Sequence, residues 1–114
     1  MPVVLIKSAE TMAPDAIGPL TAPAKPVSDP PPKIRSLDKG ENPDCGVWEC
    51  TPGKFRRTIP NAEFAHFVKG RCVFHPDGGA PVEIKAGDSV YMPANTHGVW
   101  EVFETVRKTW ILLP

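Results

Sequence analysis

Proline and glycine interrupt this chain so often that no long helix fits between them. The 114 residues include 15 prolines and 9 glycines, and eight of the prolines lie within residues 1–32. Proline has no amide proton and fixes φ, so helix interiors and central strands exclude it. No window of about eleven residues shows helical periodicity. We therefore expect an all-β fold.

Short apolar runs begin at about residue 44, and turns rich in glycine and proline separate them. The runs are GVWEC (46–50), EFAHFVKG (63–70), RCVFH (71–75), VEIK (82–85), SVYMP (89–93), GVWEVFE (98–104) and RKTWILL (107–113). The segment PDGGAP (76–81) favours a hairpin, because Asp-Gly and Gly-Gly accept the positive φ of tight turns. Short strands at this spacing are typical of a β-sandwich or barrel.

The N-terminal part is predicted to be an extended, proline-rich arm. Residues 8–40 include the run DPPP at 29–32, which favours neither helix nor central strand. We assign residues 1–43 to the arm and residues 44–114 to one barrel domain, since a chain of this length forms one domain by default. The proline-free run VVLI (3–6) is a candidate edge strand. The arm packs either on its own barrel or on a partner subunit, and the sequence leaves both open.

The charge balance and the apolar runs exclude several classes of partner. Thirteen basic and thirteen acidic side chains are interspersed and give a net charge of zero, whereas a nucleic-acid-binding protein needs a basic face. No apolar run is long enough to cross a bilayer. The start, MPVVLIKSAE, lacks the long apolar region of a signal peptide. We expect a cytoplasmic protein without nucleic-acid or membrane partners.

The chain has three cysteines, Cys45, Cys50 and Cys72. An odd number in a cytoplasmic chain indicates free thiols rather than disulfides. Each is expected to behave as a small, partly buried apolar side chain. No cysteine has a motif-related histidine and no GxSxG motif is present, so the sequence shows no nucleophile-and-base pair.

Two spacings in the barrel region match the motifs of a known family. Glu63 is followed after six residues by Gly70, and Gly87 is followed after five residues by Pro93. With the phrases GVWECTPGKFR, EFAHFVKG and KAGDSVYMPANTHGVWEVFETVRK, the last 70 residues or so resemble a small single-domain cupin. The resemblance implies a jelly-roll β-barrel. The subgroup it resembles includes ureidoglycine aminohydrolase and ethanolamine-utilisation cupins.

In metal-binding cupins, three histidines and a glutamate of these motifs hold one divalent ion. Here the His-x-His position falls on residues 56–59 (RRTI), and the other histidine position falls on Gly98, next to His97. The resemblance therefore supplies one ligand, Glu63, whereas a metal site uses three or more. We expect no resident cofactor; the alternative is a divalent transition metal held by Glu63 and His97. Because side chains alternate along a strand, His97 is expected to point away from the face of Gly98.

Small barrels offer a pocket at the mouth, and aromatic and polar side chains are candidates to line it. The predicted pocket residues are Trp48, Arg56, Thr58, Glu63, Tyr91, Trp100 and Lys108, with Trp110 as a further aromatic candidate. Arg56 is expected to grip a carboxylate, and Lys108 to anchor one or to act as base or nucleophile. Alternatively, Lys108 is exposed beside acidic neighbours, and Glu63 pairs with a nearby arginine. The five phenylalanines are assigned to the core.

Three functions are open, because one fold hosts many chemistries. The first, which we expect, is the binding of a small polar or carboxylate-containing molecule in the barrel. The second is a metal-dependent aminohydrolase-like enzyme acting on a ureido or amino-acid-like substrate, a chemistry that relies on a metal. The third is a non-catalytic structural or regulatory dimer. A homodimer is expected in each case, because open sheet edges need cover.

Overall fold

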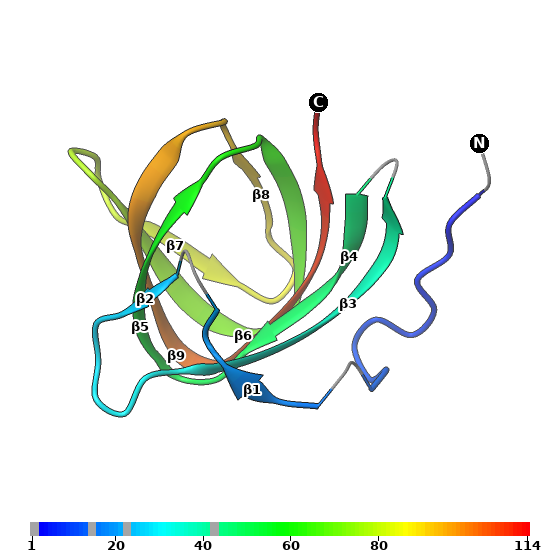
Figure 1. Ribbon diagram of the computed structural model, residues 1–114, viewed down its shortest axis with the longest axis horizontal. Coiled ribbons are helices and arrows are strands. Elements are labelled where there is room, and N and C mark those ends of the chain that lie inside the picture. The colour runs from blue at the N-terminus through cyan, green and yellow to red at the C-terminus, as the bar shows by residue number, and fades with distance from the viewer. Residues whose placement is uncertain (1–2, 14–15, 22–23, 42–43) are drawn as a thin grey trace.

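The computed structural model describes residues 3–13, 16–21, 24–41 and 44–114. In these ranges the chain forms nine strands of one curled antiparallel sheet, so the expected all-β, barrel-like fold is confirmed (Figure 1). The strands are β1 (Gly18–Pro19), β2 (Lys25–Pro26), β3 (Lys33–Glu41), β4 (Asp44–Cys50), β5 (Gly53–Ile59), β6 (Glu63–Pro76), β7 (Val82–Lys85), β8 (Ser89–Met92) and β9 (Thr96–Leu112). Within the same ranges, no helix has the length and apolar character needed to span a bilayer.

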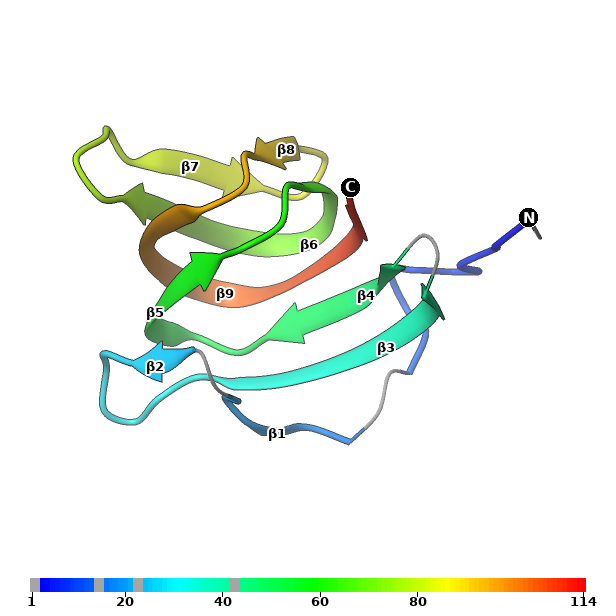
Figure 2. The same ribbon diagram turned by 45° about the horizontal axis from the view of Figure 1, so that its top comes forward.

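The long strand β9 organises the sheet. Its first half pairs with β5 and its second half with β4, while β6 pairs along its other edge. The far edge of β6 carries β7 and β8, and β3 extends the sheet beyond β4. Figure 2 shows β7 and β8 on one side of the molecule and β1, β2 and β3 on the opposite side. The curl of β6 and β9 between these sides encloses the interior.

Each of the two longest strands joins two runs that the sequence separates. In β6 the runs 63–70 and 71–75 are continuous, with register shifts between Phe67 and Cys72. Gly70 lies in this irregular stretch at φ +84°, where a Cβ atom would collide with the carbonyl oxygen of Thr105. Bulges of this kind bend a strand and increase its twist. They explain how one 14-residue strand follows the curl of the sheet.

Alternation along β9 builds the core. Gly98, Trp100 and Val102 are buried on one face, as the sequence predicts, while the residues between them are more exposed. The core cluster contains Cys50, Phe55, Ile59, Ala65, Phe67, Cys72, Phe74, Ile84, Met92, Trp100, Val102 and Val106. All three cysteines are free and buried, in agreement with the prediction. Phe64 and Phe103 are 45% and 42% exposed, so their assignment to the core is wrong.

The N-terminal third needs two corrections. Residues 33–41, which were assigned to the arm, form β3 and pair with β4 over its whole length, so the sheet begins before the expected boundary at residue 44. The run VVLI (3–6) is not a strand, and Val3 and Leu5 are 96% and 71% exposed. Proline-rich residues before β3 supply only the two-residue strands β1 and β2, in keeping with the restriction of proline to sheet edges.

Candidate functional site

A cavity of about 280 Å³ lies on the inner face of the curled sheet. Its lining comes from β3, β4, β5, β6 and β9 and comprises Ser36, Asp38, Asp44, Trp48, Phe55, Arg57, Ile59, Glu63, Trp100, Lys108, Trp110 and Leu112. Half of the lining residues are aromatic or aliphatic, and five of the side chains are ionisable. An apolar hollow with a few polar groups is the usual composition of a small-molecule site.

The most buried polar pair in this cavity is Lys108 with Glu63. Lys108 Nζ donates to Glu63 Oε2 over 2.7 Å, and the side chains are 10% and 14% exposed. The ammonium also lies 4.8 Å from the ring centroid of Trp48 and 5.4 Å from that of Trp100. Aromatic faces attract cations. The lysine is therefore held by a carboxylate and by aromatic faces at the same time.

Strand pairing explains why Lys108 faces inward. On the β4–β9 ladder Trp48 is directly opposite Lys108, and the next rung pairs Glu49 with Arg107. Because neighbouring side chains alternate, one rung lies in the cavity wall and the next faces outward. The prediction that Lys108 lies near the interior agrees with this arrangement. The alternative of an exposed lysine balancing acidic neighbours does not, and neither does an arginine partner for Glu63.

The arginine of β5 that lines the cavity is Arg57, one residue away from the predicted Arg56. Arg56, the expected anion anchor, is on the outer face, where Nη1 bonds both carboxylate oxygens of Asp77 at 3.1 and 2.9 Å. Arg57 lines the cavity instead. The inner positions of β5 are Phe55, Arg57 and Ile59, in phase with Trp100 and Gly98 on β9. The assignment failed because β5 was not recognised as a strand.

The other predicted site residues divide between the two faces of the sheet. Trp48, Glu63, Trp100 and Trp110 line the cavity as expected. Thr58 does not line it; its hydroxyl lies 2.9 Å from His97 Nδ1. Tyr91 is 56% exposed on β8 and is also outside the cavity. With Lys108, five of the eight predicted aromatic and polar side chains line the cavity.

Besides Arg57, three polar residues of the cavity wall were not predicted: Ser36, Asp38 and Asp44. Ser36 and Asp38 come from β3, which was assigned to the arm, and Asp44 is the first residue of β4, at the expected start of the barrel. Ser36 is opposite Trp48, and Asp38 is opposite Gly46. The stretch Ile34 to Asp38 does not alternate between apolar and polar residues, so the sequence held no periodic signal for this strand.

The residues of this chain do not fit the metal site of metal-binding cupins. Glu63 is engaged by Lys108, and His97 bonds Thr58 on the other side of the sheet, so the two predicted ligands do not meet. At Gly98, the histidine position of the motif, even a Cβ atom would lie 2.5 Å from the carbonyl oxygen of His75. Within the described ranges, no three His, Cys, Asp or Glu side chains converge on one point.

Two buried thiols lie near the lysine without being suited to nucleophilic chemistry. Burial raises the pKa of both Cys50 and Cys72 to about 12, although the charge of Lys108 opposes the increase. The thiolate is the reactive form of cysteine. Both side chains are therefore protonated and inert near neutral pH, and they act as core residues.

A curled antiparallel sheet with a cavity on its inner face is the architecture of a small barrel of the cupin class. Residues 37–110 match the family model described as the EutQ-like cupin domain, and the chain belongs to this family. The matched region starts within β3 and ends within β9, so it spans every strand that contributes to the cavity. No curated protein sequence matches the chain.

Solved structures share the fold at low sequence identity. The EutQ protein of Clostridium difficile has 18% identity and a TM-score of 0.67, over 79% of this chain and 76% of that one. A DUF861 family protein of Thermotoga maritima has 27% identity and a TM-score of 0.58, over 59% and 76%. A DUF861 family protein of Pseudomonas syringae, of unknown function, has 24% identity and a TM-score of 0.72, over 89% and 43%.

Proposed function

We propose that the protein binds a small organic molecule carrying a carboxylate group, and that Arg57 and Lys108 hold this group without a metal. The observation that carries the proposal is the Arg57 guanidinium. It lines the cavity, is half-buried, and forms no ion pair or hydrogen bond with any residue that the structure describes. A guanidinium grips a carboxylate through two parallel hydrogen bonds. A small carboxylate supplies the missing partner.

Lys108, which lines the same cavity, supports the same ligand. An ammonium has three donors, and Glu63 accepts one hydrogen bond from it. The remaining donors are suited to a second carboxylate. The ammonium thereby supplies the positive charge that a metal provides in metal-binding cupins, and Glu63 balances that charge when no ligand is bound.

The other lining residues restrict the chemical class of the ligand further. Trp48, Trp100 and Trp110 offer flat apolar contact, which favours a short hydrocarbon or a ring next to the carboxylate. Ser36 and Asp44 add acceptors elsewhere in the wall. The wall also contains carboxylates, whose repulsion grows with the negative charge of the ligand, so a singly charged carboxylate is favoured over a nucleotide or polyphosphate. The best ligand is a small carboxylate with a hydrogen-bond donor, such as a hydroxyl, amide or amine, at its other end.

A thermal-shift and calorimetric screen tests the proposal. The probes are small aliphatic and aromatic carboxylates, each compared with its uncharged amide. At least one carboxylate should raise the midpoint of unfolding by mass action, and its amide should not. Arg57→Met should weaken that binding by roughly thirtyfold or more, the usual cost of losing a desolvated charge partner.

Arg56→Met is the matched control, because Arg56 is the next residue on the same strand and faces outward. It should bind the carboxylate as the wild type does. Either of two results overturns the proposal: no carboxylate of the set raises the midpoint in the wild type, or the two arginine variants lose binding equally.

A homodimer stays a prediction from the open edges of the sheet. Phe64 and Tyr91, paired across β6 and β8, are 45% and 56% exposed, which leaves an aromatic pair uncovered at one edge. Sedimentation over a range of protein concentrations measures the oligomeric state and checks this prediction. A single monomeric species at the highest concentration would contradict the dimer without bearing on ligand binding.

A further inference from the structure

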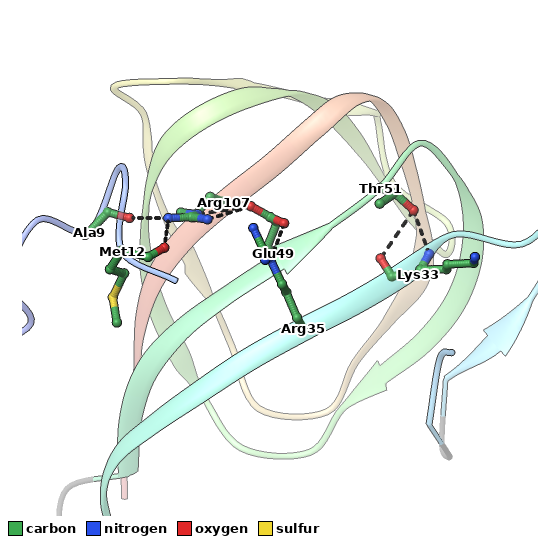
Figure 3. A network of polar contacts seen from close by, with 7 residues as sticks. All are labelled: Ala9, Met12, Lys33, Arg35, Glu49, Thr51 and Arg107. Carbon is green, nitrogen blue, oxygen red and sulfur yellow. Dashed lines mark hydrogen bonds and ion pairs between the residues drawn. The ribbon is translucent and has the colours of Figure 1, made fainter. Parts of the chain in front are cut away.

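A second polar cluster lies on the outer face of the sheet, directly behind the cavity wall. Glu49 accepts hydrogen bonds from Arg35 Nε at 2.6 Å and from Arg107 Nε and Nη2 at 3.1 and 2.8 Å (Figure 3). The side chains of Glu49 and Arg107 are 6% and 4% exposed, whereas Arg35 is 31% exposed. A buried ion pair needs all its donors satisfied to be stable.

The N-terminal segment, here residues 3–13, provides the acceptors for Arg107 Nη1, the guanidinium nitrogen that does not bond Glu49. Arg107 Nη1 donates to the carbonyl oxygens of Ala9 and Met12 at 3.1 and 2.6 Å (Figure 3). A local turn presents these two oxygens, since the amides of Thr11 and Met12 both donate to Ser8. Arg107 is thus the polar attachment of the N-terminal segment to the barrel.

The attachment point and the cavity share the same two strands. Glu49 and Arg107 form one rung of the β4–β9 ladder, and Trp48 and Lys108 form the adjacent rung. The first rung faces outward under the N-terminal segment, and the second faces the cavity. A displacement of the outer rung must move the inner one, because consecutive residues of a strand are joined by rigid peptide units.

We propose that Glu49 and Arg107 are positioning residues for the cavity, and that the N-terminal segment controls the cavity through them. With the segment docked, each side-chain nitrogen of Arg107 has an acceptor and the guanidinium holds β9 against β4, so Lys108 and Trp48 are set for a ligand. With the segment released, Arg107 Nη1 loses its acceptors, and the Glu49–Arg107 pair is held less firmly in position. This inference rests on the carboxylate-binding function proposed above. Linkage makes the effect mutual: a bound ligand holds the segment down.

The experiment uses the full chain and the best carboxylate from the screen. Arg107→Lys keeps the positive charge but loses the second arm that reaches the carbonyl oxygens. The variant should bind that carboxylate at least about fivefold more weakly, the lower end of typical coupling between sites. Trypsin cleavage after Lys7, an exposed residue of the segment, should become faster. In the wild type, the carboxylate should slow this cleavage more than it slows cleavage after Lys85.

Two variants control for a merely structural effect. Arg35→Lys changes the other arginine that bonds Glu49, and Arg35 makes none of the hydrogen bonds to Ala9 and Met12. This variant should leave both the carboxylate affinity and the rate of cleavage after Lys7 near the wild-type values. Thr11→Pro removes one of the two amides that close the segment's turn, and it changes no residue of the barrel. Thr11→Pro should weaken carboxylate binding and speed cleavage after Lys7, as expected for Arg107→Lys. It therefore tests the inference even if Arg107→Lys fails to fold.

The outcomes separate this inference from the proposed function. If Thr11→Pro frees the segment and the affinity is unchanged, the coupling is wrong and the carboxylate site stands. If no carboxylate binds the wild type, the proposed function fails. The coupling is then decided by the near-ultraviolet circular dichroism of the tryptophans: a change in Thr11→Pro but not in Arg35→Lys supports it, and identical spectra overturn it.

Discussion

Lys108 and Glu63, 45 residues apart in the chain, form an ion pair of 2.7 Å inside the barrel. Lys108 projects from the middle of the second half of β9, and Glu63 opens β6. On the ladder between these strands Lys108 is opposite Phe67 and Glu63 is opposite Leu112, so the ion pair runs diagonally along the inner face. Each charge makes the burial of the other tolerable.

Removal of either partner should destabilise the protein more than removal of both. Lys108→Met or Glu63→Gln leaves one charge in a largely desolvated site, at a cost of about 3 kcal/mol. The double variant replaces the pair with neutral groups of similar size and should be more stable than either single variant. Urea unfolding of the four proteins measures this coupling. Additive losses would show that the two charges do not depend on each other.

Stability in acid should depend on Glu49. Burial by itself would raise the pKa of Glu49, but the hydrogen bonds from Arg35 and Arg107 outweigh it and lower this pKa below the model-compound value of 4.5. A carboxyl whose pKa is lowered by folding contributes stability above its unfolded pKa, and this contribution is lost as the pH falls through the folded pKa. The loss is therefore expected below about pH 4.5.

Glu49→Gln tests this dependence. The variant should be less stable than the wild type at neutral pH by about 3 kcal/mol, because Arg107 is left buried without its counter-charge. The difference should shrink as the pH falls below 4.5. Unfolding free energies between pH 7 and pH 3 measure it, with the exposed Glu83→Gln as control. A difference that is independent of pH would contradict the assigned role of the carboxylate.

Restoring the motif histidine should damage the fold rather than create a metal site. A Cβ atom at Gly98 would lie 2.5 Å from the carbonyl oxygen of His75 and 2.6 Å from Phe74 Cζ. The clash includes backbone, so it cannot be relieved by a side-chain rotation alone. Gly98→Ala should cost about 1–3 kcal/mol, and Gly98→His should cost more. Thermal unfolding measures both, and a Gly98→His variant as stable as the wild type would refute the packing shown here.

The buried thiols should be protected from alkylation. With pKa values raised to about 12 by burial, Cys50 and Cys72 have almost no thiolate at neutral pH. Iodoacetamide should label them only after denaturation, and peptide mass spectrometry reports each site separately. Labelling of Cys72 in the native protein at a rate typical of a free thiol would contradict its position in the core.

Elemental analysis of untagged protein checks the metal alternative directly. We expect no stoichiometric transition metal, because Lys108 engages Glu63 and the described part of the chain brings no three His, Cys, Asp or Glu side chains together. Wild type and Glu63→Gln should therefore give the same result. A stoichiometric metal that disappears in Glu63→Gln would assign Glu63 as a ligand and would favour the metal-dependent aminohydrolase over the binding protein proposed here.

Much of the fold was accessible from the sequence, because it depends on local patterns. Alternation placed Trp100 and Val102 on the face of Gly98, and the spacing from Glu63 to Gly70 indicated the cupin fold. Turn residues between apolar runs marked most strand ends. Alternation, motif spacing and turn residues can be recognised without tertiary information. The two faces of a strand, for example, follow from its period of two residues.

The phase of β5 was not accessible, and with it the identity of the anion anchor. Two consecutive arginines occupy the strand, and alternation puts one of them on each face without saying which. The pairing of Arg57 with Gly98 and of Phe55 with Trp100 decides it. Register is set by packing between strands far apart in the chain, and a shift of one residue exchanges the two faces.

The sequence by itself determined the strand content and the family, and it made Lys108 a candidate for the cavity. Only the tertiary structure decided that β3 belongs to the sheet, that Arg57 rather than Arg56 faces the cavity, and that Arg107 holds the N-terminal segment. The physical reason is the same in each case. Local periodicity fixes which side chains share a face, whereas the partner across the sheet is chosen by contacts between residues distant in sequence.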